Sequence, residues 1–172
     1  MKVLPYKRRI SLVRIECTTG NIVKIPSNTL QGIDLSYLDL HRAILEQANL
    51  RGTIFIGTNL RGSYLSQADL TDAVLTKATL IVADLREAKL IRASLKDSNL
   101  SGAELTYADL HYANFQGADI GGTNLEKAHL EGANLSDCCR LEEAYIKGAF
   151  YDKYTLWPYE YEPNYYGAIF IK

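Results

Sequence analysis

The sequence has few cysteines and no long hydrophobic run. Its 172 residues include only Cys17, Cys138 and Cys139, and this odd number argues against a disulfide framework. No stretch approaches the ~20 apolar residues that a membrane-spanning helix needs. The first residues also lack the apolar core of a signal peptide, because charged side chains recur between Lys7 and Arg14. We therefore expect a protein that does not enter the membrane and that is cytoplasmic if the chain is complete.

An excess of one charge is also lacking, since the formal net charge is −1. This balance favours neither a nucleic-acid binder nor an acidic tail. The charges are nevertheless unevenly distributed. Residues 1–30 carry six basic and one acidic side chain, whereas residues 97–137 carry seven acidic and one basic. The basic cluster at residues 7–9 could contact an anionic partner, although a solvated face is the simpler interpretation.

Catalytic signatures are absent as well. The sequence contains no G-x-S-x-G nucleophile elbow, no Walker motif and no Cys-x-x-Cys pair. No residue is therefore assigned a catalytic, cofactor-binding or metal-binding role, and the expectation is a protein that is not an enzyme and needs no cofactor.

What the sequence does contain is a five-residue repeat over residues 28–135. Leucine recurs at every fifth position, and phenylalanine or isoleucine fills the gaps. We call these large apolar positions, from residue 30 to residue 135, the repeat centres. The residue two before each centre is usually small, and alanine occupies fourteen of these twenty-one small sites between residues 33 and 133. Only Ile33 and Leu38, at the start, are bulky. A repeat this regular decides the fold before any other feature is considered.

A period of five fits neither an α-helix nor a flat strand. In a helix each leucine would advance by about 140° and the set would spread around the whole surface. In a strand successive leucines would alternate faces, because five is odd. Large and small residues can both point inward only if the chain turns a corner after each centre. Eight glycines lie two residues after a centre, where a type II turn needs a positive φ. The pattern predicts closed coils that stack into a β-solenoid.

Several repeats carry a recognisable motif. The segments ANLRG at 48–52, ADLTD at 68–72 and ANLSD at 133–137 resemble the A(D/N)LXX motif of the pentapeptide-repeat family. The resemblance implies an all-β fold, a right-handed quadrilateral β-helix with four repeats per coil, about six coils in all. It also implies that the protein is not an enzyme, because the family is mostly non-enzymatic. Certain members engage type II topoisomerases as mimics of DNA.

The chain then divides into three parts. Residues 1–29 contain β-prone runs at 10–15 and 22–25 and are predicted to form a strand-turn-strand cap. Residues 30–150 are predicted to form the β-helix. Residues 151–172 are rich in tyrosine and proline, are similar to the tails of many cyanobacterial members, and are predicted to cap the other end. Uncovered coil ends would leave unpaired backbone groups.

The register of the repeat slips after Leu135. The segment 144–148 matches the motif only if one residue is inserted near residues 138–141, where a bulge could absorb it. Cys138 and Cys139 then occupy the small inward site in the old and new registers. We interpret them as small buried side chains, with a redox role as the alternative.

With four repeats per coil, residues twenty apart share a face, and outward apolar residues gather. Such residues on a solenoid indicate a contact surface. The candidate interaction surface consists of Ile54, Ile56 and Val74 on one face, with Ile81 and Val82 around the next corner.

An acidic surface is the alternative candidate. It consists of Asp84 and Glu104, which stack on one face near Glu126, and of Asp109 and Glu131 on the adjoining face. A phosphate-like display of charge is the functional interpretation, and simple solubility is the structural one.

Two histidines complete the set of candidate residues. His111 and His129 would lie on one face in adjacent coils, but no third ligand is evident, so no metal site is predicted.

The leading function is a rigid, non-catalytic scaffold or adaptor that binds another protein. A DNA-mimic modulator of a type II topoisomerase such as gyrase is the alternative. The sequence leaves the oligomeric state open, with a monomer favoured.

Overall fold

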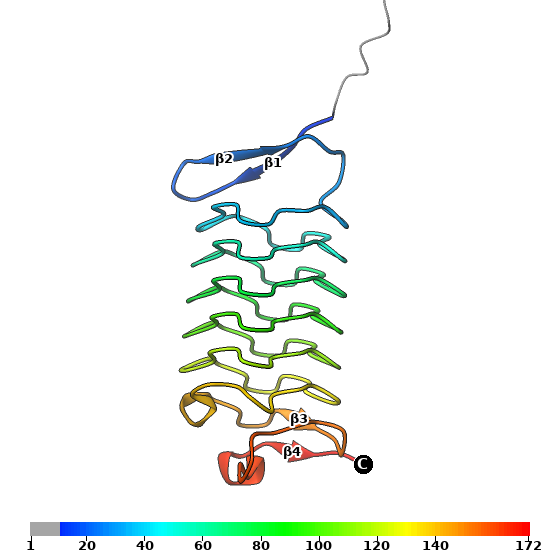
Figure 1. Ribbon diagram of the computed structural model, residues 1–172, viewed down its shortest axis with the longest axis vertical. Coiled ribbons are helices and arrows are strands. Elements are labelled where there is room, and N and C mark those ends of the chain that lie inside the picture. Colours follow the sequence, from blue (N-terminus) through cyan, green and yellow to red (C-terminus); the bar gives the residue numbers. More distant parts are fainter. Residues whose placement is uncertain (1–10) are drawn as a thin grey trace, which may run out of the picture.

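The computed structural model describes residues 11–172 and shows a rod of stacked coils (Figure 1). A hairpin of β1 (Val13–Glu16) and β2 (Ile22–Ile25) lies at one end. The other end carries a 3-10 turn (Leu141–Glu143), β3 (Phe150–Tyr151), a second 3-10 turn (Pro163–Tyr166) and β4 (Ile169–Phe170). Within the described residues, no helix is long and apolar enough to cross a membrane.

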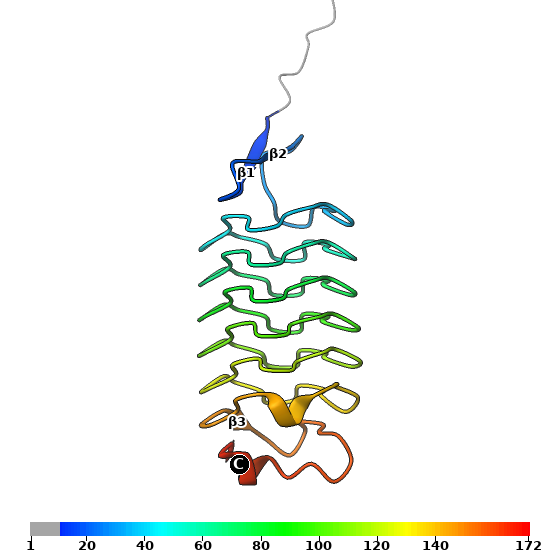
Figure 2. The same ribbon diagram turned by 90° about the vertical axis from the view of Figure 1, so that its left-hand side faces the viewer.

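Parallel bridges between residues twenty apart join each coil to the next. The series runs from Asp34 opposite Ile54 to Asp119 opposite Cys139, with four bridge positions in each coil. At a typical position, the Leu85 amide donates to the Glu104 carbonyl at 2.7 Å, and the Glu104 amide donates to the Ala83 carbonyl at 2.9 Å. The four-repeat coil is therefore confirmed. The coils are linked by isolated bridges on each side rather than by extended strands, which gives the ladder-like appearance in Figure 2.

The core is a column of large side chains lined by small ones. The repeat centres from Leu40 to Leu135 are almost completely buried, including Phe55, Phe115 and Ile120. Burial of each such side chain contributes roughly 1.5–3 kcal/mol, so the apolar core can support the fold. The alanines two residues earlier are buried as well in nearly every repeat, because a larger side chain would meet the facing leucines.

Three consecutive small sites carry hydroxyl groups, as the sequence shows. The expected backbone hydrogen bonds form at Thr53, whose Oγ1 donates to the Leu30 carbonyl at 2.6 Å, and at Thr58, whose Oγ1 donates to Leu35 at 2.8 Å. The same expectation is wrong for Ser63, whose buried Oγ has no partner.

The corners have the left-handed backbone that the glycine pattern predicts. The amide of each small residue donates to the carbonyl of the preceding centre, for example Ala88 to Leu85 at 3.1 Å. From Leu30 to Leu130, the residue two after each centre has a positive φ whether or not it is glycine. The Asp and Asn residues before the centres stabilise the same corner: Asn59 Oδ1 accepts the Arg61 amide at 3.2 Å. These residues are therefore structural as well as solvated.

The predicted N-terminal strand-turn-strand is confirmed within the described residues. In the antiparallel hairpin, Val13 lies opposite Ile25. The end of β1 pairs with the first coil: Cys17 forms an antiparallel bridge to Ala43, and the Ile44 amide donates to the Glu16 carbonyl at 2.7 Å. This pairing satisfies part of the exposed edge of the first coil. The expected strand start at residue 10 and the basic cluster at 7–9 lie outside the described residues.

The one-residue insertion is also found where the register slips. The next two bridges pair residues 21 apart, Asn124 with Tyr145 and His129 with Phe150. Arg140 (φ 57°) and the first 3-10 turn absorb the extra residue.

Cys138 fills the small site, where its Sγ contacts the Phe115 carbonyl oxygen at 3.2 Å and burial raises the pKa of the thiol to about 12. Cys139 is exposed, so its predicted burial is wrong: the insertion follows it, and the residue takes an outward bridge position.

Backbone stacking continues beyond residue 150. Leu156 forms a bridge with Asn134, and Thr155 Oγ1 donates to the Leu130 carbonyl at 2.9 Å. β4 then pairs in parallel with β3. The rings of Trp157, Tyr161 and Tyr166 stack in sequence beneath these segments, with centroid separations of 5.5 and 4.8 Å. The tail therefore lies at this end of the rod (Figure 1), where these three rings stack on one another.

Candidate functional site

The candidate apolar surface occurs as two separate spots. Ile54 and Val74 bridge each other on one side of the rod, and both side chains are half-buried, as is Ile56. The next side of the coil carries Thr79, and Ile81 and Val82 lie at the corner that follows it. Of the five residues only Val82 is exposed, with 56% of its surface accessible. The structure brings Ile54 and Val74 together and leaves Val82 as a separate apolar projection.

Val82 has an unfavourable backbone conformation. Its φ is 49°, a region that β-branched residues rarely adopt. The equivalent positions in neighbouring coils are Arg42, Gly62, Gly102 and Gly122, which avoid branching at Cβ. Val82 lines a surface groove of about 300 Å³ together with His41, Arg42, Arg61, Gly62, Ser63, Tyr64 and Asp84. A strained, exposed apolar side chain beside two arginines is the feature of this corner that packing does not explain.

Replacement of Val82 tests the strain. We expect Val82→Gly to stabilise the fold by about 1 kcal/mol, because the strain of a left-handed residue, ~1–2 kcal/mol, exceeds the entropic cost of glycine, ~0.5–1 kcal/mol. Thermal melting measures the change as a rise of roughly 2–4 °C. Val74→Gly is the matched control and should lower the melting temperature, since Val74 lies in a bridge without a positive φ. A lower melting temperature for Val82→Gly would contradict the interpretation.

The acidic surface is largely engaged in internal contacts. Arg86 donates two hydrogen bonds to Asp84, at 2.8 and 2.7 Å, and this guanidinium lowers the pKa of the Asp84 carboxyl despite partial burial. Glu104 accepts a hydrogen bond from Asn124 Nδ2 at 3.0 Å. Asp84 bridges Glu104 on one side of the rod, as predicted from the repeat, and Glu126 lies two residues after Asn124, which bridges Glu104 in the next coil. Arg86 thus neutralises the charge of Asp84, which interrupts a continuous acidic stripe on this side.

The other two acidic residues form a cluster with the two histidines. Asp109 Oδ1 lies 2.6 Å from His111 Nδ1, and Glu131 Oε1 lies 3.0 Å from His129 Nδ1. Across the two coils, Glu131 Oε2 lies 3.6 Å from His111 Nε2. The imidazole rings stack at a centroid separation of 5.5 Å. The prediction that no third potential ligand lies near these histidines is wrong, because the His111, His129 and Glu131 ligand atoms lie within 4.8 Å of one another.

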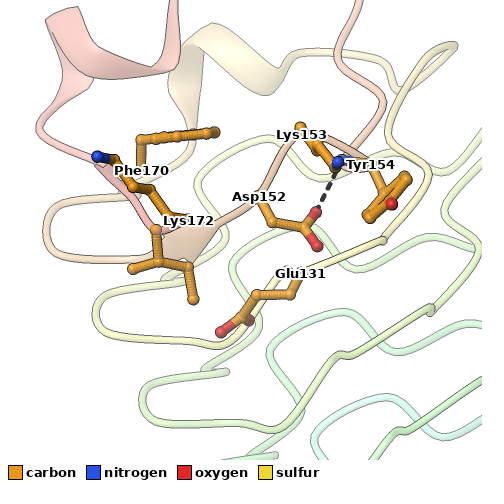
Figure 3. A pocket seen from close by; sticks show the side chains of 7 residues that line it. Glu131, Asp152, Lys153, Tyr154, Phe170 and Lys172 are labelled. Atoms are coloured by element: carbon orange, nitrogen blue, oxygen red, sulfur yellow. Dashed lines mark hydrogen bonds between the residues drawn. The ribbon is translucent and has the colours of Figure 1, made fainter.

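The sequence argument also missed a pocket next to this cluster. A cavity of about 400 Å³ is lined by Glu131, Asp152, Lys153, Tyr154, Phe170, Ile171 and Lys172 (Figure 3). Figure 3 shows Asp152 between Glu131 and the loop that carries Tyr154, with the Tyr154 amide donating to Asp152 Oδ1 at 3.0 Å. Burial would raise the pKa of Asp152, but hydrogen bonds from the Gly132, Tyr154 and Thr155 backbone amides lower it. The pocket arises from the pairing of β4, which the sequence pattern does not indicate.

Comparison with known proteins agrees with this architecture. The profile of the pentapeptide repeats matches residues 29–67, 53–90, 83–122 and 113–150, with 8 copies. None of the curated proteins matches the sequence. Among solved structures, the chain is similar to the pentapeptide repeat protein Rfr23 from the cyanobacterium Cyanothece 51142, with 29% identity and a TM-score of 0.58 over 75% of this chain and 87% of that one.

A second similar structure has the same fold at lower identity. It is a trypsin-treated form of QnrB1, a plasmid-mediated fluoroquinolone resistance protein, with 22% identity and a TM-score of 0.60 over 74% of this chain and 68% of that one. The repeat profile extends over most of the chain, the solved structures share its fold, and the twenty-residue bridge spacing reproduces four pentapeptides per coil. The chain belongs to the pentapeptide repeat family.

Proposed function

We propose that this protein is a non-catalytic scaffold whose rigid, right-handed quadrilateral β-helix, capped at both ends, presents an outer surface to another protein. The observation that carries the proposal is Val82, an exposed apolar residue kept in a strained backbone conformation. Strain of this kind persists where it serves a contact, since glycine would relieve it. Membership of a mostly non-enzymatic family supports the same function.

The groove beside Val82 suggests the chemistry of the partner segment. Arg42 and Arg61 lie in the same groove, and neither forms an ion pair within the described part of the chain. An apolar anchor beside two cationic side chains fits a partner segment that combines an apolar residue with carboxylates. Ile54, Ile56 and Val74 form a second apolar spot that a broad partner surface could cover.

Self-association through the Ile54 spot can be tested directly. If a second copy of the chain binds there, Ile54→Lys/Ile56→Lys should convert any dimer to monomer, because two like charges would be brought into an apolar contact. Size-exclusion chromatography with light scattering measures the mass, and circular dichroism verifies the fold. Lys77→Ala, at an exposed corner of the neighbouring coil, is the control. A wild-type chain that is monomeric at high concentration would exclude this form of the interaction.

The DNA-mimic alternative predicts a different activity. A mimic needs a strongly negative surface along much of its length. Here Asp84 is paired with Arg86 and Asp72 with Arg92, and Glu131 is buried. We therefore expect no inhibition of DNA supercoiling by gyrase, and no protection from quinolone, at micromolar protein and stated salt. Potent inhibition that disappears in Glu104→Lys/Asp109→Lys would make the acidic surface the functional site.

A further inference from the structure

The two histidines and two carboxylates form a square array on one side of the rod. Asp109 and His111 flank the buried Leu110, and His129 and Glu131 flank the buried Leu130 one coil further on. Because Asp109 bridges His129, each imidazole lies beside a carboxylate of its own coil and next to the other pair. Phe150 stacks on the far face of His129 at 5.0 Å and covers the array from the next coil.

Two hydrogen-bond acceptors face each other within this array. Asp109 accepts from Nδ1 of His111, so the Nε2 atom of the neutral ring carries a lone pair. That atom points to Glu131 Oε2 at 3.6 Å. The Glu131 side chain is 10% exposed, and its Oε2 is buried without a hydrogen-bond partner. An unpartnered buried carboxylate oxygen opposite an imidazole lone pair is stabilised by a cation between them.

We propose that His111, His129 and Glu131 bind a divalent transition-metal ion of the zinc class. Two imidazoles and one carboxylate are a ligand set that suits Zn²⁺, whereas Mg²⁺ and Ca²⁺ prefer oxygen ligands. Ligand atoms around tetrahedral Zn²⁺ lie about 3.3 Å apart, given bonds of ~2.0–2.1 Å. Glu131 approaches His129 Nδ1 at 3.0 Å through Oε1 and His111 Nε2 at 3.6 Å through Oε2, and one ligand atom from each of the three residues lies within 4.8 Å of the others.

Asp109 is the positioning residue of this site. Its carboxylate accepts from Nδ1 of His111, which fixes the tautomer and directs Nε2 toward the ion. With neutral histidines, Asp109 and Glu131 give the array a charge that matches a divalent cation. The site borders the pocket of Figure 3 through Glu131, so solvent or an anionic group can complete the coordination from that side.

Metal titration of the full-length, tag-free chain tests the proposal. After removal of metal with a chelator, isothermal titration with Zn²⁺ should show one ion per chain with micromolar or tighter affinity. Co²⁺ should give the visible absorption of a tetrahedral nitrogen and oxygen site without a thiolate charge-transfer band. Asp109→Asn should weaken binding about 10–100-fold while leaving the metal-free melting temperature nearly unchanged. Saturating Zn²⁺ should raise the melting temperature of the wild type.

Variants of the array and matched controls decide the outcome. His111→Ala, His129→Ala and Glu131→Gln should each abolish the stoichiometric site, and Zn²⁺ should no longer stabilise these proteins. His41→Ala, which removes the remaining histidine, and Cys139→Ser, which removes the exposed thiol, should bind like the wild type. The proposal is overturned if the wild type binds less than one equivalent, or if binding survives in His111→Ala. It is also overturned if Cys139→Ser abolishes binding.

Discussion

Replacement of Leu85 by aspartate is expected to destabilise the protein severely. Leu85 is fully buried at a repeat centre, and the bridge to Glu104 holds its backbone in the ladder. A carboxylate at this position would lie inside the apolar core, without a cationic partner. An unpaired buried charge costs more than about 4 kcal/mol, a large fraction of the stability of a domain. Thermal melting should show a loss of at least ~10 °C or no cooperative transition.

The adjacent residue provides the matched control. Arg86 is exposed and contributes only the surface ion pair with Asp84, so Arg86→Ala should change stability by less than ~1 kcal/mol. We thus expect a large loss of stability for one residue and almost none for its neighbour, because one side chain points into the coil and the other away from it. Similar losses in melting temperature for the two variants would contradict the inward and outward assignment.

Deletion of residues 151–172 is expected to have the second largest effect. It removes buried Tyr151 and the bond from Thr155 Oγ1 to the Leu130 carbonyl, and it leaves the amide of Leu135 without the Leu156 carbonyl at 2.7 Å. An uncovered coil presents unpaired backbone groups and the apolar side chains of the last layer. We expect the truncated protein to aggregate or to associate through this end, as size-exclusion chromatography with light scattering would show.

Tyr159→Ala is the control for the truncation. Tyr159 belongs to the same aromatic tail but is 92% exposed, so its removal should leave mass and melting temperature unchanged. A truncated chain that remains as monomeric and as heat-stable as the full chain would show that the tail does not protect the end of the rod.

The sequence was sufficient to predict the repeat architecture because the same five-residue pattern specifies every coil. The spacing of five predicted which side chains are buried, and the glycine positions predicted the corners with positive φ. The mismatch after Leu135 predicted the one-residue insertion. It did not predict that Cys139 is exposed, since the motif leaves the exact position of an insertion undetermined. A two-residue strand such as β4 has too few residues for a periodic signal, so the pocket that it forms was missed.

Part of the histidine cluster was accessible from the sequence. Glu131 follows His111 by twenty residues and therefore stacks on it in the next coil, as the structure shows. Assigning Glu131 only to an acidic surface concealed this relation. The burial of its carboxylate and the missing partner of Oε2 depend on side-chain rotamers and on the layer added by Phe150 and Asp152, which spacing alone does not give.

The central claim is that an apolar outer surface, rather than the acidic one, contacts a partner protein. Affinity capture from the native organism with quantitative mass spectrometry, using wild type, Val82→Gly, Ile54→Lys/Ile56→Lys and Glu104→Lys/Asp109→Lys as parallel baits, tests it most directly. We predict specific proteins that are retained by the acidic-surface variant and lost with at least one apolar-surface variant, while every bait keeps its cooperative melting transition. Proteins lost only with the acidic-surface variant would contradict the account.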